Sequence, residues 1–140
     1  TSSCKLSGSN IKNLAKLIAS MTPVLTENEY VFGTLETYDY EQVLLLNPIS
    51  TFQEKEGLTV ILTKEKADEF NISYSGVFKC ITLNVHSSLD AVGLTAAVAT
   101  KLTQSNISAN VIAAYYHDHI FVPSDKAELA LTALAEFCSE

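Results

Sequence analysis

Apolar residues recur along this chain at two spacings, and each spacing predicts a different kind of element. Near the start, four apolar side chains lie three or four residues apart: Ile11, Leu14, Ile18 and Met21. This spacing predicts an amphipathic helix that ends before Pro23. Runs rich in aromatic and branched residues then predict strands over three stretches: 29–35, 42–46 and 58–63. The third stretch, LTVILT, is continuously apolar, so we expect a buried central strand, one available to complete the sheet of the second half.

Polar stretches separate these elements. TYDYE at 37–41 predicts a turn between the first two strands. NPISTFQEKEG at 47–57 is the longest stretch for which we predict irregular structure, and KEKADEFN at 64–71 predicts a short helix. The first half therefore has the predicted order α-β-β-loop-β-α.

The second half begins with VFKCITLNVH at 77–86, whose side chains alternate as in a strand. Alternation places Cys80 and Thr82 on one face and Ile81 and Leu83 on the other. The following stretch, 89–105, predicts a helix with an apolar stripe: Ala91, Leu94, Val98 and Leu102.

Two further strands, 110–116 and 119–123, are predicted around a polar turn of two or three residues. Ser124 is expected to cap a last helix, with Asp125 and Glu128 in its first turn. The apolar stripe of this helix is Ala127, Leu131, Leu134 and Cys138. The order of the second half is therefore β-α-β-β-α.

Each half has the element order of a four-stranded ferredoxin-like unit that lacks one strand. We therefore predict an α+β fold of two such halves, 1–72 and 73–140, packed as one body. The sheets should be antiparallel, with helices on one face and strand exchange between the halves, because an incomplete sheet edge is unfavourable. No stretch rich in Pro, Gly or Ser separates the halves.

Charge and composition exclude several classes of partner. The chain has 140 residues and a net charge of −7, and its nine basic residues are scattered. Nucleic acid and anionic membrane surfaces bind clustered Lys and Arg, so neither is expected as a partner. No apolar run approaches the roughly 20 residues that cross a bilayer, and TSSCKLSGSN lacks the apolar core of a signal peptide.

The cysteines and histidines suit a reduced, cytoplasmic protein without a metal. Cys4, Cys80 and Cys138 are odd in number, far apart and in no metal or redox spacing. In HDH at 117–119, aspartate favours a hairpin turn, and a turn would point the two histidines in different directions. We therefore predict a polar corner and no metal site here. Glycine-rich nucleotide motifs and a nucleophile elbow are absent from the sequence, so no cofactor and no catalysis are expected.

HSSLDAVGLTAA at 86–97 is the stretch most typical of a binding site. It takes the chain from a strand into a helix, where free backbone N–H groups favour a carboxylate. Gly93 would let a ligand approach the backbone closely. The alternative is structural: Ser87 or Ser88 caps the helix, and Gly93 allows tight packing on the sheet.

HSSLDAVGLTAAVATKLTQSNISANVIAAYYHDHIFVPSDKAELAL resembles the ACT-domain sequence of strand, Asp-x-x-Gly-Leu turn, helix, strand, hairpin and helix. In the first half, LIASMTPVL, YVFGTL and TFQEKEGLTVIL resemble one subgroup: small bacterial tandem ACT-like proteins of unassigned function. The resemblance covers roughly residues 11 to 135. HSSL at 86–89 departs from the usual ACT-domain pattern, in which a basic residue and a proline precede the glycine.

This resemblance implies a regulatory or sensory module that binds a small molecule, with an amino acid as the expected ligand. It carries Asp90, Gly93 and Leu94 onto the family turn and Asn110 onto the strand after the helix. The expected ligand contacts also include three residues that precede this turn, His86, Ser87 and Ser88, and two residues of the first half, Glu54 and Glu56. The two glutamates match the first-half motif and would meet an amino group through opposite charge. Since no enzyme domain accompanies the module, a regulated partner would be a separate chain. The alternatives are an interaction or structural oligomer without ligand and, further removed, a metal-dependent or hydrolytic enzyme.

The predicted helix at 89–105 also indicates a homodimer. Asp90 and Lys101 are its only charged residues. Beyond its apolar stripe it carries small residues, which would let a second chain approach closely. Two-fold pairing is the most common symmetry of such assemblies.

Overall fold

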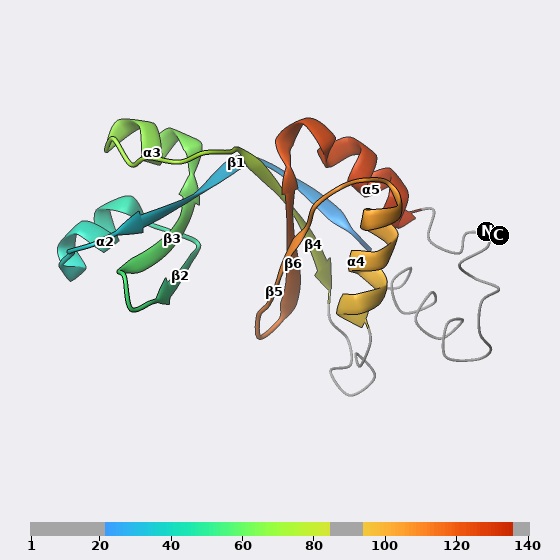
Figure 1. The fold of residues 1–140 in the computed structure, drawn as a ribbon, viewed down its shortest axis with the longest axis horizontal. Helices are drawn as coiled ribbons and strands as arrows, with labels where there is room; N and C mark the ends of the chain where they lie inside the picture. The colour runs from blue at the N-terminus through green and yellow to red at the C-terminus, as the bar shows by residue number, and fades with distance from the viewer. Residues whose placement is uncertain (1–21, 85–93, 136–140) are drawn as a thin grey trace. The chain divides into compact units, whose positions relative to one another are not determined.

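The computed structural model of the chain describes residues 22–84 and 94–135 (Figure 1). The elements in these ranges are β1 (Val24–Leu35), α2 (Tyr40–Leu46), β2 (Ser50–Gln53), β3 (Leu58–Thr63), α3 (Lys64–Glu69), β4 (Phe78–Asn84), α4 (Leu94–Gln104), β5 (Asn110–Ala113), β6 (His117–Pro123), η3 (Ser124–Lys126) and α5 (Ala127–Ala135). They form two compact units. The first unit is Glu27–Lys79, and the second contains the described residues 22–26, 80–84 and 94–135. The helix predicted at 11–21 lies outside the described residues.

The first unit is an antiparallel sheet with the strand order β2-β3-β1. Leu35 of β1 and Gln53 of β2 both pair with Leu58 of β3. Alternate strand residues point to one face, where they form a buried core with Leu46 of α2 and Ala67 of α3: Val31, Leu35, Leu58, Val60 and Leu62. LTVILT is therefore the buried middle strand of its unit, as predicted, and α2 and α3 cover the same face.

The strand predicted at 42–46 is wrong, because QVLLL belongs to the helix α2. The Asp39 side chain accepts a hydrogen bond from the Gln42 amide at 2.8 Å, which caps the start of the helix. Asn47, with φ 48°, ends it in the left-handed conformation. The expected turn TYDYE thus contains a helix cap. An apolar run of this length does not distinguish a strand from a helix, and here the two caps decide.

The irregular structure predicted at 47–57 is also wrong, since this stretch contains β2 and a tight hairpin turn. Ser50 pairs with Ile61 and Gln53 with Leu58. The Glu54 amide donates to the Gly57 carbonyl at 2.8 Å. The central strand β3 supplies the hydrogen-bonding partner that makes this polar stretch extended.

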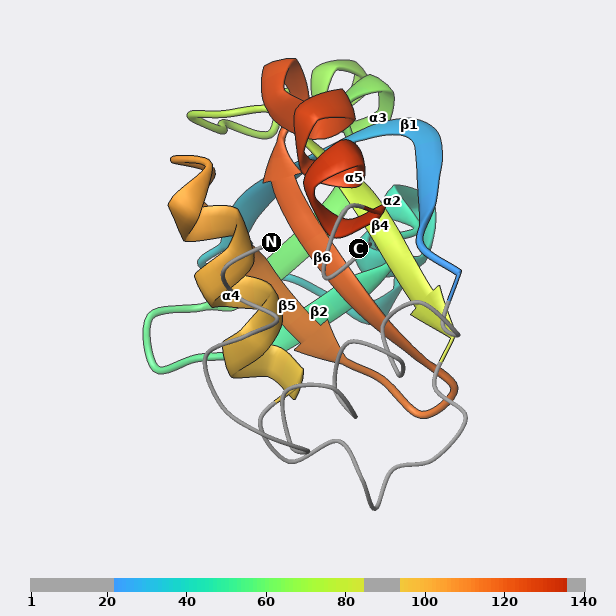
Figure 2. The same ribbon diagram turned by 90° about the vertical axis from the view of Figure 1, so that its right-hand side faces the viewer.

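The second unit contains an antiparallel sheet in which β4, β6 and β5 are neighbours. Helices α4 and α5 cover one face of this sheet (Figure 2). The core below the helices is formed by alternate residues of β4 and β6 together with residues of both helices: Ile81, Leu83, Val98, Leu102, Ile120, Val122, Ala130 and Leu134. The predicted faces of β4 and the stripe residues Val98 and Leu102 are confirmed.

β1 supplies the strand that the second unit lacks. Its first residues lie beside β4, where the Thr26 hydroxyl donates to the Cys80 carbonyl at 3.1 Å. Leu25 packs against the core of the second unit, whereas Val31 and Leu35 belong to the first. Strand exchange is therefore present, but the shared strand is β1, not LTVILT as expected. β3 is unavailable because β1 and β2 occupy its two edges.

The polar corner predicted at 117–119 is wrong, because His117, Asp118 and His119 begin the strand β6. Asp118 pairs with Ala113 of β5, and the hairpin turn falls at Tyr115 and Tyr116, which are 89% and 71% exposed. The Ala114 amide closes this turn by donating to the His117 carbonyl at 2.9 Å. The strand end fixes the orientation of both histidines, which therefore lie on one face.

The last helix begins differently from the prediction. Ser124 lies inside the 3₁₀ turn η3, and the residue before that turn is Pro123, which provides no side-chain cap. Ala127 and Leu134 are buried as expected, together with Ala130 and Ala133. The compact units divide the chain at 26/27 and 79/80, whereas the two halves inferred from the sequence, 1–72 and 73–140, remain a prediction. None of the helices described has the length and apolarity needed to span a membrane.

Candidate functional site

Five residues predicted to bind a ligand lie outside the described residues: His86, Ser87, Ser88, Asp90 and Gly93. The structure does describe the two elements that they connect, because β4 ends at Asn84 and α4 begins at Leu94. The first turn of α4 contains no acidic side chain.

Asn110 is not brought together with Leu94. The helix between them, α4, has 11 residues and is therefore about 16 Å long at 1.5 Å per residue. The chain reverses at Asn106, whose φ is 59°, and enters β5 at the opposite end of the helix (Figure 1). Within one chain, α4 therefore separates Leu94 from the strand that contains Asn110.

Glu54 and Glu56 lie in the turn between β2 and β3 of the first unit, and both are exposed. The Thr59 hydroxyl donates a hydrogen bond to Glu54 Oε1. Gly57 makes this turn possible because its φ is 155° and a β-carbon there would lie 2.5 Å from the Leu35 carbonyl oxygen. The hairpin thus orients Glu54, and it presents two carboxylates at its tip.

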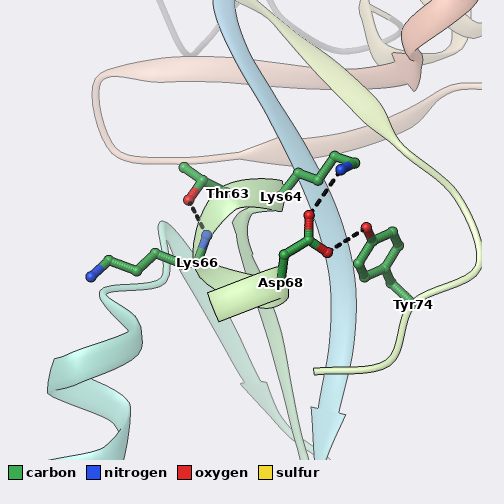
Figure 3. A network of polar contacts seen from close by, with 5 residues as sticks. All are labelled: Thr63, Lys64, Lys66, Asp68 and Tyr74. Atoms are coloured by element: carbon green, nitrogen blue, oxygen red, sulfur yellow. Dashed lines mark hydrogen bonds and ion pairs between the residues drawn. The ribbon is translucent and has the colours of Figure 1, made fainter. Parts of the chain in front are cut away.

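The first unit also contains an open polar cavity of about 310 Å³ at the start of α3. It is lined by Asn28, Glu29, Thr63, Lys64, Glu65 and Asp68. Lys64 Nζ lies 2.9 Å from Asp68 Oδ2, and the Tyr74 hydroxyl donates to Asp68 Oδ1 at 2.8 Å (Figure 3). The Thr63 hydroxyl caps α3 by accepting a hydrogen bond from the Lys66 amide at 3.2 Å.

Lys64 and Asp68 form an ion pair in this cavity, whose lining also contains two further carboxylates, Glu29 and Glu65. The hydrogen bond from Lys64 lowers the pKa of Asp68, and Tyr74 adds to this effect. The same contacts with Asp68 raise the pKa of Lys64 and the pKa of Tyr74. All three groups are solvated, so the pairing adds little stability. From the sequence we predicted only a helix here; the spacing of Lys64 and Asp68, four residues apart, was the available signal.

An open cavity of about 390 Å³ lies in the second unit, where the end of α4 meets the start of the last helix. It is lined by Thr103, Asn106, Ile107, Ser108, Pro123 and Lys126. Lys126 Nζ donates to the Asn106 carbonyl at 3.0 Å, which fixes the ammonium group beside the C-terminal end of α4. This cation position suits the negative end of the helix dipole and was not predicted from the sequence.

A polar cluster occupies the sheet face opposite α4 and α5. His119 Nδ1 lies 3.2 Å from Thr82 Oγ1 and 3.8 Å from Cys80 Sγ. The ring of His117 lies 6.0 Å from that of His119. Burial lowers the pKa of His119 and raises the pKa of the Cys80 thiol. A catalytic cysteine needs a depressed pKa, so this pair does not have the electrostatics of an activated nucleophile.

Within residues 22–84 and 94–135, no group of three or more His, Cys, Asp or Glu side chains is placed to bind a metal. His117 and His119 lie on the same strand face, and His117 Nδ1 is buried without a hydrogen-bond partner. His86 lies outside these ranges.

Two family models, each described as an ACT domain, match the chain in tandem, one over residues 9–79 and one over residues 77–136. No curated protein matches the sequence. The crystal structure of a protein of unknown function from Vibrio cholerae, described as a possible transport protein, is similar to this chain. The two are 53% identical, with a TM-score of 0.82 over 94% of this chain and 100% of that one.

Two more distant structures show the same fold. The regulatory subunit of aspartate kinase from Thermus thermophilus, in its ligand-free form, is 11% identical, with a TM-score of 0.61 over 81% of this chain and 94% of that one. A protein from Agrobacterium tumefaciens is 16% identical, with a TM-score of 0.67 over 82% of this chain and 87% of that one.

Proposed function

The chain belongs to the ACT-domain family, and from this premise we propose that it is a non-catalytic regulatory module that binds an amino acid or a similar small metabolite. ACT domains are typically regulatory modules for small molecules. The likeness to the regulatory subunit of aspartate kinase concerns the fold alone. It is compatible with a tandem ACT protein that acts on a separate regulated chain.

The main support for this proposal is the N-terminal end of α4, which lies in the segment that matches an ACT domain. β4 leads through the 85–93 connection into a helix whose first turn has no acidic side chain. A ligand carboxylate at this helix end would meet free N–H groups and the positive end of the helix dipole. We assign this contact to His86, Ser87, Ser88, Asp90, Gly93 and Leu94.

Glu54 and Glu56 remain candidates for an amino group, because they are exposed carboxylates at a hairpin tip. Asn110 would serve a ligand at the other end of α4, since this helix of 11 residues, about 16 Å long, lies between Asn110 and Leu94. The cytoplasm is the proposed location, and a homodimer is the proposed assembly, as ACT domains often oligomerise.

A thermal-shift screen over the amino acids tests this function. A ligand that binds only the folded state stabilises it by mass action, so at about 100 times its Kd we expect the melting temperature to rise by roughly 10 °C. In the variant Gly93→Val, added bulk should block close approach to the backbone and abolish the shift while the protein still folds.

Gly76→Val is the matched control. A β-carbon at Gly76 would lie 3.4 Å from the Phe78 ring, which is an ordinary contact, so this variant should fold and keep the ligand-induced shift. The proposed site is wrong if an amino acid stabilises Gly93→Val as strongly as the unmodified chain. The proposed function is wrong if neither an amino acid nor a related metabolite shifts the melting temperature.

A protein-interaction module without ligand is the second candidate. One observation favours it: several large apolar side chains of the first unit are exposed, among them Tyr40 and Leu44 of α2. Contacts with other chains are among the roles of exposed apolar surfaces.

A further inference from the structure

The cavity between the end of α4 and the start of the last helix has a lining that suits an anion. Its volume is about 390 Å³, and small-molecule pockets in proteins span about 300 to 1,000 Å³. The lining contains one basic residue and no acidic residue: Thr103, Asn106, Ile107, Ser108, Pro123 and Lys126. The chain as a whole carries a net charge of −7, so a cavity with a positive lining is not what the composition predicts.

The ammonium group of Lys126 is held in place at this cavity. Lys126 is half-buried, and its Nζ donates a hydrogen bond to the Asn106 carbonyl at 3.0 Å. An ammonium group has three donors, so this contact leaves two N–H groups for a ligand. The Asn106 carbonyl is a neutral acceptor, and an acceptor that carries a negative charge forms a stronger hydrogen bond with an ammonium group.

The other side chains of the lining can complete a small-molecule site. Asn106 contributes an amide and Ser108 a hydroxyl, and both can donate to an anion. The Thr103 hydroxyl already donates to a carbonyl of its own helix at 2.7 Å, so Thr103 is left as an acceptor. Ile107 and Pro123 supply apolar surface. A few convergent polar groups beside apolar surface are typical of ligand pockets.

The cavity of the first unit lacks this combination. Its lysine, Lys64, is paired with Asp68, whose Oδ2 lies 2.9 Å from Nζ. Glu29 and Glu65 also line that cavity, so an anion there would meet a lining with an excess of negative charge. The two cavities therefore differ in the sign of the ligand charge that they favour.

The acidic side chains close to Lys126 in the sequence do not line its cavity. Asp125 precedes Lys126, Glu128 follows in the first turn of α5, and both are exposed. Interactions between exposed charges are screened over about 8 Å at physiological salt. Repulsion from these carboxylates and from the net charge is therefore weaker than a direct contact with the ammonium group.

We propose that this cavity is a second binding site of the chain, for a small metabolite whose carboxylate or phosphate group contacts Lys126. The bound group accepts hydrogen bonds from Lys126 Nζ and from the side chains of Asn106 and Ser108. This inference goes beyond the proposed function, because α4, about 16 Å long, lies between the cavity and Leu94. The two sites can therefore be tested separately.

Heteronuclear NMR titrations of the full chain test the second site with two probes, sodium phosphate and sodium succinate, while sodium chloride keeps the ionic strength constant. At least one probe should shift the amide signals of Asn106, Ser108 and Lys126 saturably, with a Kd on the order of 1 to 10 mM for a few charge-assisted contacts. Saturation by phosphate alone assigns the site to phosphorylated compounds, and saturation by succinate alone assigns it to carboxylates.

Four variants make the test specific. Ser108→Asp places a carboxylate in the cavity without removing Lys126, so it should abolish saturation. Lys126→Gln removes the cation, and Kd should rise at least about 10-fold, the size of one charge-assisted hydrogen bond. The matched controls are Thr100→Asp, on the exposed side of α4, and Lys101→Gln, which removes a positive charge outside the lining. Both controls should bind the probe as the unmodified chain does.

The cavity is not an anion site if neither probe saturates these signals up to about 50 mM, several times the expected Kd. It is also not one if Ser108→Asp and Lys126→Gln bind as tightly as the unmodified chain, or if Lys101→Gln weakens binding as much as Lys126→Gln. Gly93→Val should bind either probe with an unchanged Kd, and a loss of binding there would place the anions at the 86–94 turn instead. A negative amino acid screen does not alter these titrations, so the two proposals fail separately.

Discussion

Replacing Gly57 by alanine should destabilise the first unit strongly, although the residue lies in a surface hairpin. The β-carbon would lie 2.5 Å from the Leu35 carbonyl oxygen and 3.1 Å from Glu36 Cα, whereas ordinary contacts begin near 3.4 Å. The backbone φ of 155° is also one that L side chains rarely adopt. Leu35 cannot retreat easily, because it pairs with Leu58 in the β1–β3 ladder.

The magnitude follows from two costs. A strained backbone conformation costs about 1 to 3 kcal/mol, and overpacking against backbone atoms costs a further 1 to 3 kcal/mol. We expect a loss of about 3 kcal/mol in the free energy of unfolding, a large part of the roughly 5 to 15 kcal/mol typical of a whole domain. Urea unfolding followed by circular dichroism should show the midpoint falling by on the order of 1.5 M.

Gly76→Ala is the control for this substitution. A β-carbon at Gly76 would be 3.4 Å from the Phe78 ring, so its effect should stay within about 0.5 kcal/mol. If Gly57→Ala unfolds at the same urea concentration as the unmodified chain, the turn does not require glycine. The assigned geometry around Glu54 would then be incorrect.

Two further predictions concern the histidines. Elemental analysis of protein purified without an affinity tag should find well below one equivalent of zinc, nickel or iron, and near-stoichiometric metal that disappears in His117→Ala would contradict this. Because burial lowers the pKa of His119 in the folded chain, the unfolded chain binds more protons once the pH falls below about 6.5. Stability should therefore be retained above that pH and decline as the pH drops towards the lowered pKa of His119. Urea midpoints at several pH values should show this decline, and His119→Gln should reduce it; an equal decline in that variant would assign the effect to other groups.

The candidate site was predicted from the sequence only in part. The match of 86–97 to a strand, a turn and a helix located the connection, and the structure confirms that β4 and α4 flank it. The resemblance to ACT domains grouped Asn110 with Leu94, and in the structure α4 lies between them. The charge-matched group of Lys64, Asp68 and Tyr74 was missed because Tyr74 reaches Asp68 only after the chain turns back beyond α3.

The sequence by itself determined the elements in which a single periodicity dominates. LTVILT is a buried strand, β4 alternates with Ile81 and Leu83 in the core, and α4 buries Val98 and Leu102. In each case the spacing of apolar side chains matches one backbone geometry and one buried face, so local pattern and tertiary burial agree.

The tertiary structure alone decided features that depend on a distant partner. QVLLL packs as a helix because Leu46 enters the core made by β1 and β3. TFQ is extended because β3 offers hydrogen bonds, and HDH is strand because Asp118 pairs with Ala113. β1 completes the second sheet because its first residues lie beside β4. Short apolar or polar runs are compatible with several backbone conformations, and the energy that selects one comes from contacts with residues far away in the chain.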